Sequence, residues 1–239
     1  MTNIAERTLA SLVSSNHQSA AVLEKYNLDF CCKGKKTLSE ACKEKELSLS
    51  QVTEELMQLN EEKEKHLPFE EMTAEQLISY ILIHHHFYVK EALPRIRQHI
   101  EKVAFKHGEH YPFMIKVYEN FLAVYEELTM HMEKEELILF PRIKQIERQL
   151  EQQSGAHYQR GYVTAPINIM LQEHEHAGSL LAEIKERTNN YSIPDGACNT
   201  FRVTLLELKE FEEDLHKHVH LENYILFPKA EAIVGQLQG

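Results

Sequence analysis

The sequence is poor in the residues that interrupt helices, with only 8 glycines and 7 prolines among its 239 residues. Long helices are therefore the expected secondary structure. No apolar run approaches the roughly 18 residues that mark a transmembrane helix, and no charged-then-apolar segment opens the chain. We accordingly expect a protein that neither spans a membrane nor is exported, and that works in the cytoplasm.

Basic residues are also in the minority. The chain has 26 Lys and Arg against 37 Asp and Glu, a formal net charge of -11, and its basic residues are not gathered into one stretch. This argues against a general binder of nucleic acid or of anionic membranes, since both need concentrated positive charge. Small molecules, metal ions or protein partners are favoured instead.

Cysteine is scarce, and Cys31, Cys32, Cys42 and Cys198 do not form the spaced framework of a disulfide-stabilised domain. A disulfide between the adjacent Cys31 and Cys32 would be strained. The stretch KGKK that follows them should lower the pKa of the thiols and favour thiolate, the form that binds metal. We expect Cys31 and Cys32 to be cofactor-binding; the alternative is that they are small buried apolar residues.

The chain is long enough for one or two domains, and its composition changes along its length. Residues 1–60 read as short helices and form an expected small helical domain that carries the cysteine pair. Residues 61–73 are charged, contain a proline and lack an apolar stripe, which is typical of a linker. Residues 74–239 form the expected second domain.

The second domain reads as an all-α, antiparallel four-helix bundle. Thr73 and Gln76 have the spacing of a capping box, which predicts a helix start at residue 74. Breaks containing Gly or Pro separate long apolar stripes of helical period, and connections of such lengths suit antiparallel neighbours. The predicted helices span about 74–107, 112–150, 165–189 and 197–234.

Histidine, by contrast, is abundant at 15 residues, and it occurs in a motif that the chain writes twice: HMEKEELILFP at 131–141 and HVHLENYILFP at 218–228. In each copy the His and the Glu four residues later fall on the apolar stripe of their helix, where core residues belong. His131 and Glu135 therefore point inward, as do His218 and Glu222.

Two glutamates in one core need a compensating positive charge, because burial of an unpaired carboxylate costs several kcal/mol. No Lys or Arg lies on those stripes, so we infer a metal cation. Residues four apart on a helix lie on the same face, about 5–6 Å apart between Cβ atoms, so each His and Glu can reach one ion cluster.

The other two helices each carry one histidine on the inward stripe, His86 and His174. The distance along the chain from His86 to His131 is nearly that from His174 to His218, so the domain is an internal repeat of two helical hairpins. Six ligands exceed the four of a structural zinc site. Two non-haem iron ions, bridged by the carboxylates and an oxo group, are the expected cofactor, with manganese as the alternative.

The histidines next to these inward residues are not expected to face the core, because consecutive helical residues point about 100° apart. His84 and His85 are assigned to the surface or to support of the ligands, and His176, His216 and His220 are likewise not expected to bind metal. Glu127 and Glu173 either orient ligand imidazoles or lie on a solvated helix face.

These motifs resemble those of the iron–sulfur cluster repair di-iron proteins, also called repair of iron centres proteins. LDFCCKGKKTLSEAC resembles the family's short paired-cysteine domain. The two copies of the doubled motif, together with QEHEHAGSLL, resemble its hemerythrin-like helices. The resemblance assigns the iron ligands to the same six residues: His86, His131, Glu135, His174, His218 and Glu222. One departure is Lys33, which stands where the family usually has a glycine.

The resemblance implies repair of iron–sulfur clusters damaged by nitric oxide or peroxide, with damaged iron–sulfur proteins as partners and iron donation as the leading mechanism. It also implies a homodimer through the small domain. The first alternative is binding or reduction of nitric oxide, oxygen or peroxide at open iron positions. Reversible oxygen carriage is disfavoured, since related carriers use five histidines. The second alternative is a structural metal in a protein that acts through contacts of its N-terminal residues.

Overall fold

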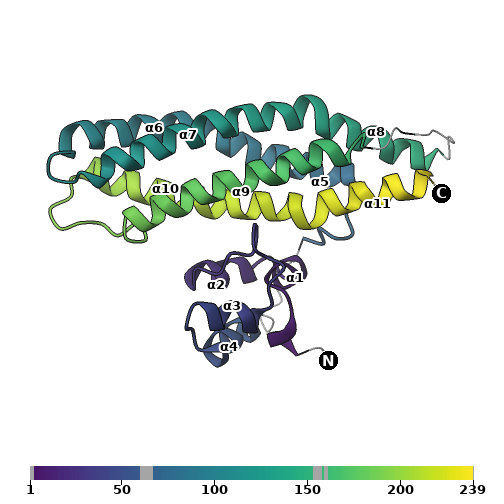
Figure 1. Ribbon diagram of the computed structural model, residues 1–239, viewed down its shortest axis with the longest axis horizontal. Coiled ribbons are helices and arrows are strands. Elements are labelled where there is room, and N and C mark those ends of the chain that lie inside the picture. The colour runs from purple at the N-terminus through teal and green to yellow at the C-terminus, as the bar shows by residue number, and fades with distance from the viewer. Residues whose placement is uncertain (1–2, 60–66, 153–157, 159–160, 239) are drawn as a thin grey trace.

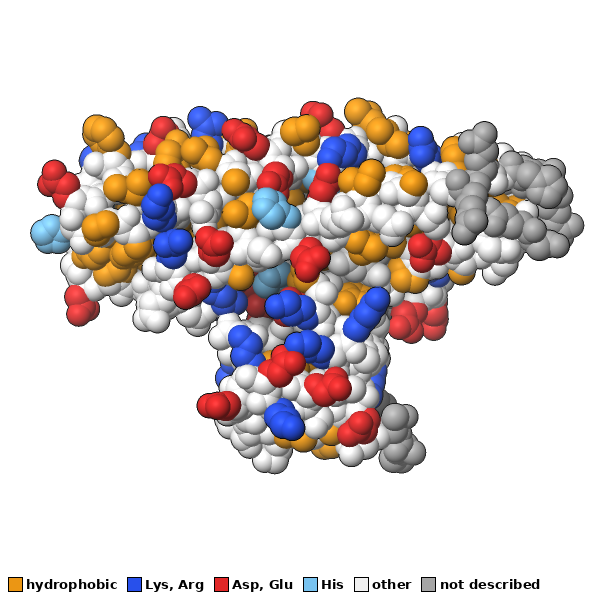
Figure 2. Space-filling view, in the orientation of Figure 1, with side chains coloured by type: hydrophobic (Ala, Val, Ile, Leu, Met, Phe, Trp, Pro, Cys, Tyr) orange, Lys and Arg blue, Asp and Glu red, His pale blue; other side chains and the backbone are white. Residues whose placement is uncertain are grey.

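A computed structural model describes residues 3–59, 67–152, 158 and 161–238. Figure 1 shows a long bundle of helices with a cluster of short helices against one flank, beside α9, α10 and α11 and away from α6 and α7. Acidic and basic side chains are interspersed over the face that Figure 2 shows.

The N-terminal cluster consists of one 3₁₀ turn and four short helices. The turn η1 spans Ile4–Glu6, and the helices are α1 (Leu9–Ser15), α2 (Ser19–Lys25), α3 (Leu38–Glu44) and α4 (Leu49–Leu59). The side chain of Thr37 caps α3 by accepting from the Glu40 N–H, while Glu40 accepts from the Thr37 N–H. Such reciprocal bonds satisfy two of the backbone donors that a helix start leaves unpaired.

The bundle contains the four long helical stretches that the sequence predicts. The capping box at Thr73 and Gln76 is present, and the first stretch begins at Ala74 as expected. Residues 61–66 of the predicted linker lie outside the described residues, which resume at Leu67. The four stretches comprise α5 (Ala74–Ile81), η2 (Leu82–His86) and α6 (Phe87–His107); α7 (Phe113–Lys134), η3 (Glu135–Leu139) and α8 (Phe140–Glu151); α9 (Thr164–Arg187); and α10 (Asn199–Leu221), η4 (Glu222–Leu226) and α11 (Phe227–Gln238).

Three of these four stretches widen into one π-helical turn in mid-course, which the sequence did not reveal. The turn η2 ends at His86, η3 begins at Glu135, and η4 begins at Glu222. A π turn inserts one extra residue into the helix and so rotates the side chains that follow, and such turns concentrate at functional sites. All three of these turns lie at candidate metal ligands.

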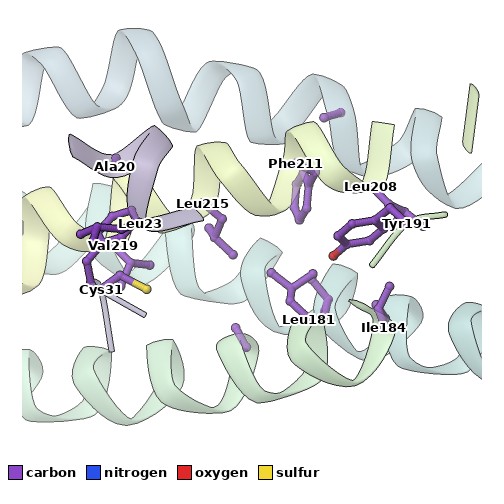
Figure 3. Close-up of a cluster of buried hydrophobic side chains, with 14 of the residues drawn as sticks. Ala20, Leu23, Cys31, Leu181, Ile184, Tyr191, Leu208, Phe211, Leu215 and Val219 are labelled. Atoms are coloured by element: carbon purple, nitrogen blue, oxygen red, sulfur yellow. The ribbon is translucent and has the colours of Figure 1, made fainter. Parts of the chain in front are cut away.

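The N-terminal helices share a hydrophobic core with the bundle. Figure 3 shows Leu23 of α2 and Cys31 beside Val219 of α10, within a cluster that continues along α10 to Leu215 and Phe211. Leu23 has no exposed surface, and Val219 is 4% exposed. Burial of such apolar side chains contributes roughly 1.5–3 kcal/mol each, which holds the cluster against the bundle. Among the described residues, no helix is both long and apolar enough to cross a membrane.

Candidate metal centre

The structure brings all six predicted ligands together in the middle of the bundle. They form two groups of four, each with donor atoms within 4.8 Å of one another. Glu135 and Glu222 belong to both groups, whereas each histidine belongs to one. His86 and His218 complete the first group, and His131 and His174 complete the second.

Each group aims its donor atoms at a common point. In the first group, His86 Nε2 lies 3.4 Å from Glu135 Oε2, and His218 Nε2 lies 3.1 Å from Glu222 Oε1. In the second group, His131 Nε2 lies 3.3 Å from Glu135 Oε2, and His174 Nε2 lies 3.2 Å from Glu222 Oε2. The Nε2 atoms of His131 and His174 are 3.0 Å apart, as expected of two lone pairs directed at one ion.

The chemistry of the buried donors fits metal ions. Glu135 and Glu222 have no exposed surface, and the four histidines are at most 2% exposed. Both oxygens of each glutamate, and Nε2 of His86 and of His218, have no hydrogen-bond partner. Buried polar atoms without partners are rare and costly in native proteins. Cations bound between them would satisfy these atoms, so the residues fit a two-metal site.

The metal-free electrostatics show the same demand for positive charge. Burial disfavours a charged His131, yet the carboxylates of Glu135 and Glu173 raise its pKa to about 10. Burial disfavours a charged Glu222 as well, but the His218 and His174 imidazoles hold the pKa of Glu222 well below its usual range. For His218 burial prevails and lowers the pKa. The carboxylates thus stay ionised because imidazoles beside them can carry a proton. Bound metal ions would supply this positive charge more effectively.

Two of the candidate ligand histidines are hydrogen-bonded to a carboxylate that also pairs with a lysine. The Nδ1–H of His86 donates to Glu136 over 2.8 Å, and Lys90 donates to both oxygens of that glutamate. His131 Nδ1 lies 2.9 Å from Glu173, which also pairs with Lys134. An acceptor at Nδ1 fixes the tautomer that leaves Nε2 free for metal and raises its basicity.

The third candidate ligand histidine is hydrogen-bonded to a side-chain amide instead. His174 Nδ1 lies 2.8 Å from Asn223 Oδ1, and the Asn223 side chain donates to the Cys31 carbonyl over 3.2 Å. The Cys32 thiol lies 3.7 Å from the carbonyl oxygen of His174. The paired cysteines therefore lie against this side of the metal centre.

The fourth ligand histidine, His218, has no partner at Nδ1. Its ring stacks on that of His85, with centroids 5.4 Å apart and planes 5° from parallel. His85 is 6% exposed, and its Nδ1 lies 3.0 Å from Asp214 Oδ1. His85 is thus a buried support for a ligand, one of the two roles that the sequence left open.

The remaining neighbours divide between the surface and the interface with the N-terminal helices. His84 is exposed and packs on Tyr80, and His176 is exposed and pairs with Glu127. Glu127 therefore lies on the solvated face, whereas Glu173 is hydrogen-bonded to the candidate ligand His131. His216 and His220 are in contact with Glu24 and Phe30 of the N-terminal segment, a role that their helical period does not reveal because the partner is distant in sequence.

The expectation that Cys31 is a thiolate is wrong. Cys31 is buried at 2% exposure, and the neighbouring Cys32 thiol, burial and the Asp29 carboxylate raise the pKa of Cys31 well above its usual value. Asp29, which sequence reasoning overlooked, organises the pair by accepting from the N–H groups of Cys31 and Cys32. Both cysteines are free, and with Asp29 they form a third group with metal-ligand chemistry.

Comparison with known proteins accounts for both parts of the chain. The hemerythrin HHE cation binding domain matches residues 77–230, and a domain of unknown function (DUF542) matches residues 5–60. The iron-sulfur cluster repair protein YtfE of Pectobacterium atrosepticum is 35% identical over 94% of this chain and 96% of its own length. The chain belongs to the hemerythrin-like iron–sulfur cluster repair family.

Other members of this repair family give the same correspondence. YtfE of Yersinia pseudotuberculosis is 35% identical and that of Dickeya chrysanthemi 33% identical, each over 94% of this chain and 96% of the relative. The match spans both the cysteine-bearing segment and the bundle. The predicted family and all-α fold are confirmed, and the residues matched by the cation-binding domain include the six clustered candidate ligands.

Proposed function

We propose that the six ligands hold two non-haem iron ions and that the protein repairs iron–sulfur clusters damaged by nitrosative or oxidative stress, by donating iron. The observation that carries this proposal is the sharing of Glu135 and Glu222 between two groups of donors. A carboxylate offers two oxygens, so each shared glutamate can bridge two ions. Four imidazoles and two carboxylates suit non-haem iron, with manganese as the alternative.

The side chains around the centre hold and orient these donors. Glu136 and Glu173 fix the tautomers of His86 and His131, and each is partly exposed and capped by a lysine. The apolar residues of the bundle exclude water from the donors themselves. Bound iron would supply a redox-active ion and, as cargo, the metal that an incomplete cluster lacks.

Relatives named as iron–sulfur cluster repair proteins support this function, and damaged iron–sulfur proteins in the cytoplasm are the proposed partners. A homodimer through the N-terminal segment belongs to the same proposal.

The test is transfer of iron-57 from the loaded full-length protein to an iron–sulfur apoprotein, in the presence of sulfide and an iron chelator. We expect two irons per chain, a coupled pair in the Mössbauer spectrum, and transfer that outpaces capture by the chelator. Glu135→Gln with Glu222→Gln should abolish loading. Glu207→Gln is the matched control, because Glu207 forms ion pairs with Arg95 and His99 away from the centre. Iron that stays bound while the acceptor remains unrepaired would refute donation.

A second candidate function is binding or reduction of nitric oxide, oxygen or peroxide. The observation that favours it is that each group has four protein residues, which leaves positions free on an octahedral ion. Catalytic consumption of nitric oxide by the reduced protein would support reduction, and stoichiometric nitrosylation alone would contradict reduction and leave only binding.

A further inference from the structure

Asn223 connects the metal centre to the N-terminal segment through a single side chain. Its Oδ1 lies 2.8 Å from Nδ1 of the ligand His174, and its Nδ2 donates to the carbonyl of Cys31 over 3.2 Å. The two ends of the Asn223 amide thus join the ligand His174 to Cys31, which lies 192 positions from Asn223 in the sequence. Asn223 itself follows directly after the shared ligand Glu222.

An amide suits this place for a chemical reason. The His174 Nδ1–H needs an acceptor so that its Nε2 stays free for metal, and the Cys31 carbonyl needs a donor. A carboxylate could accept from His174 but could not donate to Cys31. The amide of Asn223 does both, and each bond fixes the orientation that the other requires.

The equivalent position in the first hairpin makes the contrast clear. Glu136 follows directly after Glu135 and accepts from the ligand His86, as Asn223 accepts from His174. The second partner of Glu136, however, is Lys90 of the same bundle. The residue at this position of the repeat therefore connects a ligand histidine to a lysine in the first half and to the N-terminal segment in the second.

The carbonyl that Asn223 contacts is held in place by the docked segment. Asp29 fixes the backbone of Cys31 and Cys32, and the Cys32 thiol lies against the carbonyl of His174. Behind them, Leu23 packs beside Val219 of α10, as Figure 3 shows. Displacement of this segment would remove the partner that orients the Asn223 amide.

We propose that Asn223 is a positioning residue that couples docking of the Cys31–Cys32 segment to the ion held by His131 and His174. When the segment is displaced, the amide loses its anchor and this ion is released faster, while the ion held by His86 and His218 is unaffected. The proposal rests on the two-iron function above and adds which iron the N-terminal segment controls.

The experiment measures release of both irons from the anaerobic, reduced, full-length protein into an iron(II) chelator, without any acceptor. We expect Asn223→Leu, which removes both bonds at similar volume, to speed release of one iron per chain by about 10–100-fold, the usual effect of losing such a partner. The other iron should leave at its original rate. Mössbauer spectra of the iron that remains identify a single site.

Two further variants separate positioning from general damage. Asn223→Asp keeps the acceptor for His174 and loses the donor to Cys31. It should release the same single iron faster than the unmutated protein but more slowly than Asn223→Leu, while alkylation of the partly buried Cys32 speeds up relative to the exposed Cys198 as an internal standard. Leu23→Ala displaces the segment from outside the centre and should speed release of the same single iron.

The decisive measurement is a double-mutant cycle, in which variants that break the same link do not add. Leu23→Ala combined with Asn223→Leu should release iron no faster than Asn223→Leu alone, whereas Leu23→Ala combined with Glu136→Gln should show both effects. Equal acceleration of both irons, no acceleration, or full additivity of the first pair would overturn the coupling. Absence of bound iron in the unmutated protein would instead refute the two-iron function on which the coupling rests.

Discussion

The two hairpins of the bundle carry the same pattern of candidate metal ligands but differ in the residues that surround it. In the first hairpin, the residue two positions after the shared glutamate is Leu137, which is 75% exposed. In the second it is Tyr224, which packs on His220, and burial raises the pKa of Tyr224 to about 12. The inward candidate ligands are thus the same in both hairpins, whereas the outer face of the second hairpin is covered by the N-terminal helices.

This difference extends to the supports of the ligands. Lys90 follows His86 by four residues and holds Glu136, whereas Gly178 follows His174 by four residues and lies beneath the Cys32 thiol. Lys134 follows His131 by three residues and pairs with Glu173, while the corresponding residue after His218 is the buried Leu221. The first hairpin thus supports its ligands with charge, and the second with an amide, a stacked ring and a docked segment.

The largest expected effect would show that the inner centre is symmetric. Glu135→Gln alone, or Glu222→Gln alone, should weaken both irons, because each glutamate belongs to both groups. We expect fewer than one iron per chain by metal analysis. Without metal, each variant should unfold at a lower temperature than the metal-free unmutated protein, because despite burial the neighbouring imidazoles lower the pKa of both carboxyls, so that the ionised carboxylates stabilise the fold.

A loss of exactly one iron in either variant would contradict this expectation and would mean that the carboxylate serves one ion.

The next effect concerns the docked face alone. Leu23→Ala should destabilise the N-terminal helices by about 2–5 kcal/mol, the cost of a cavity at a fully buried leucine. Hydrogen exchange should quicken in residues 9–59 and remain unchanged in α6 and α7. Leu137→Ala is the control on the uncovered hairpin, where an exposed leucine should contribute little. Equal effects of the two variants would mean that the segment is not held by this contact.

Removal of the charge that supports His86 in the first hairpin should have a smaller effect and should weaken the binding of only one ion. Glu136→Gln keeps an acceptor for His86 and removes its charge, which should weaken the ion at His86 and His218 by about tenfold, the lower end for losing such a partner. Titration with iron under a competing chelator measures this. The alkylation rate of Cys32 should stay constant, and a change there would show that the two hairpins communicate.

The smallest effect tests how closely the segment approaches. A Cβ on residue 178 would lie 3.3 Å from the Cys32 Sγ, so Gly178→Ala requires the thiol to move by a few tenths of an ångström. Alkylation of Cys32 should change by less than about threefold, since a shift of well under 1 kcal/mol is expected at a partly exposed side chain. A large change in iron retention would instead mean that the position of the Cys32 thiol affects the metal centre.

Most of the bundle was predictable because its determinants are periodic. The apolar stripes fixed the extents of the long helices, and the polar residues that interrupt those stripes identified His131, Glu135 and their counterparts. Other features were not accessible in this way. The π turns at His86, Glu135 and Glu222 have no counterpart in α9, although α9 also places a histidine, His174, on its inward face.

The thiol environment was mispredicted for a related reason. The lysines after the cysteine pair are near in sequence, but the side chains around Cys31 are Asp29, Cys32 and the apolar residues of the docked interface. Burial beside a carboxylate opposes ionisation of a thiol, so tertiary contacts reversed the direction that the sequence had suggested.

The sequence by itself determined the helices and the six inward donors, because these are written in repeats of three and four residues that any chain of this pattern must place on one face. The family followed from the resemblance of its motifs. Only the tertiary structure decided how the two halves differ. His85, Asn223, Asp29, His216 and His220 acquire their roles from contacts between segments far apart in the chain, and local periodicity carries no information about such partners.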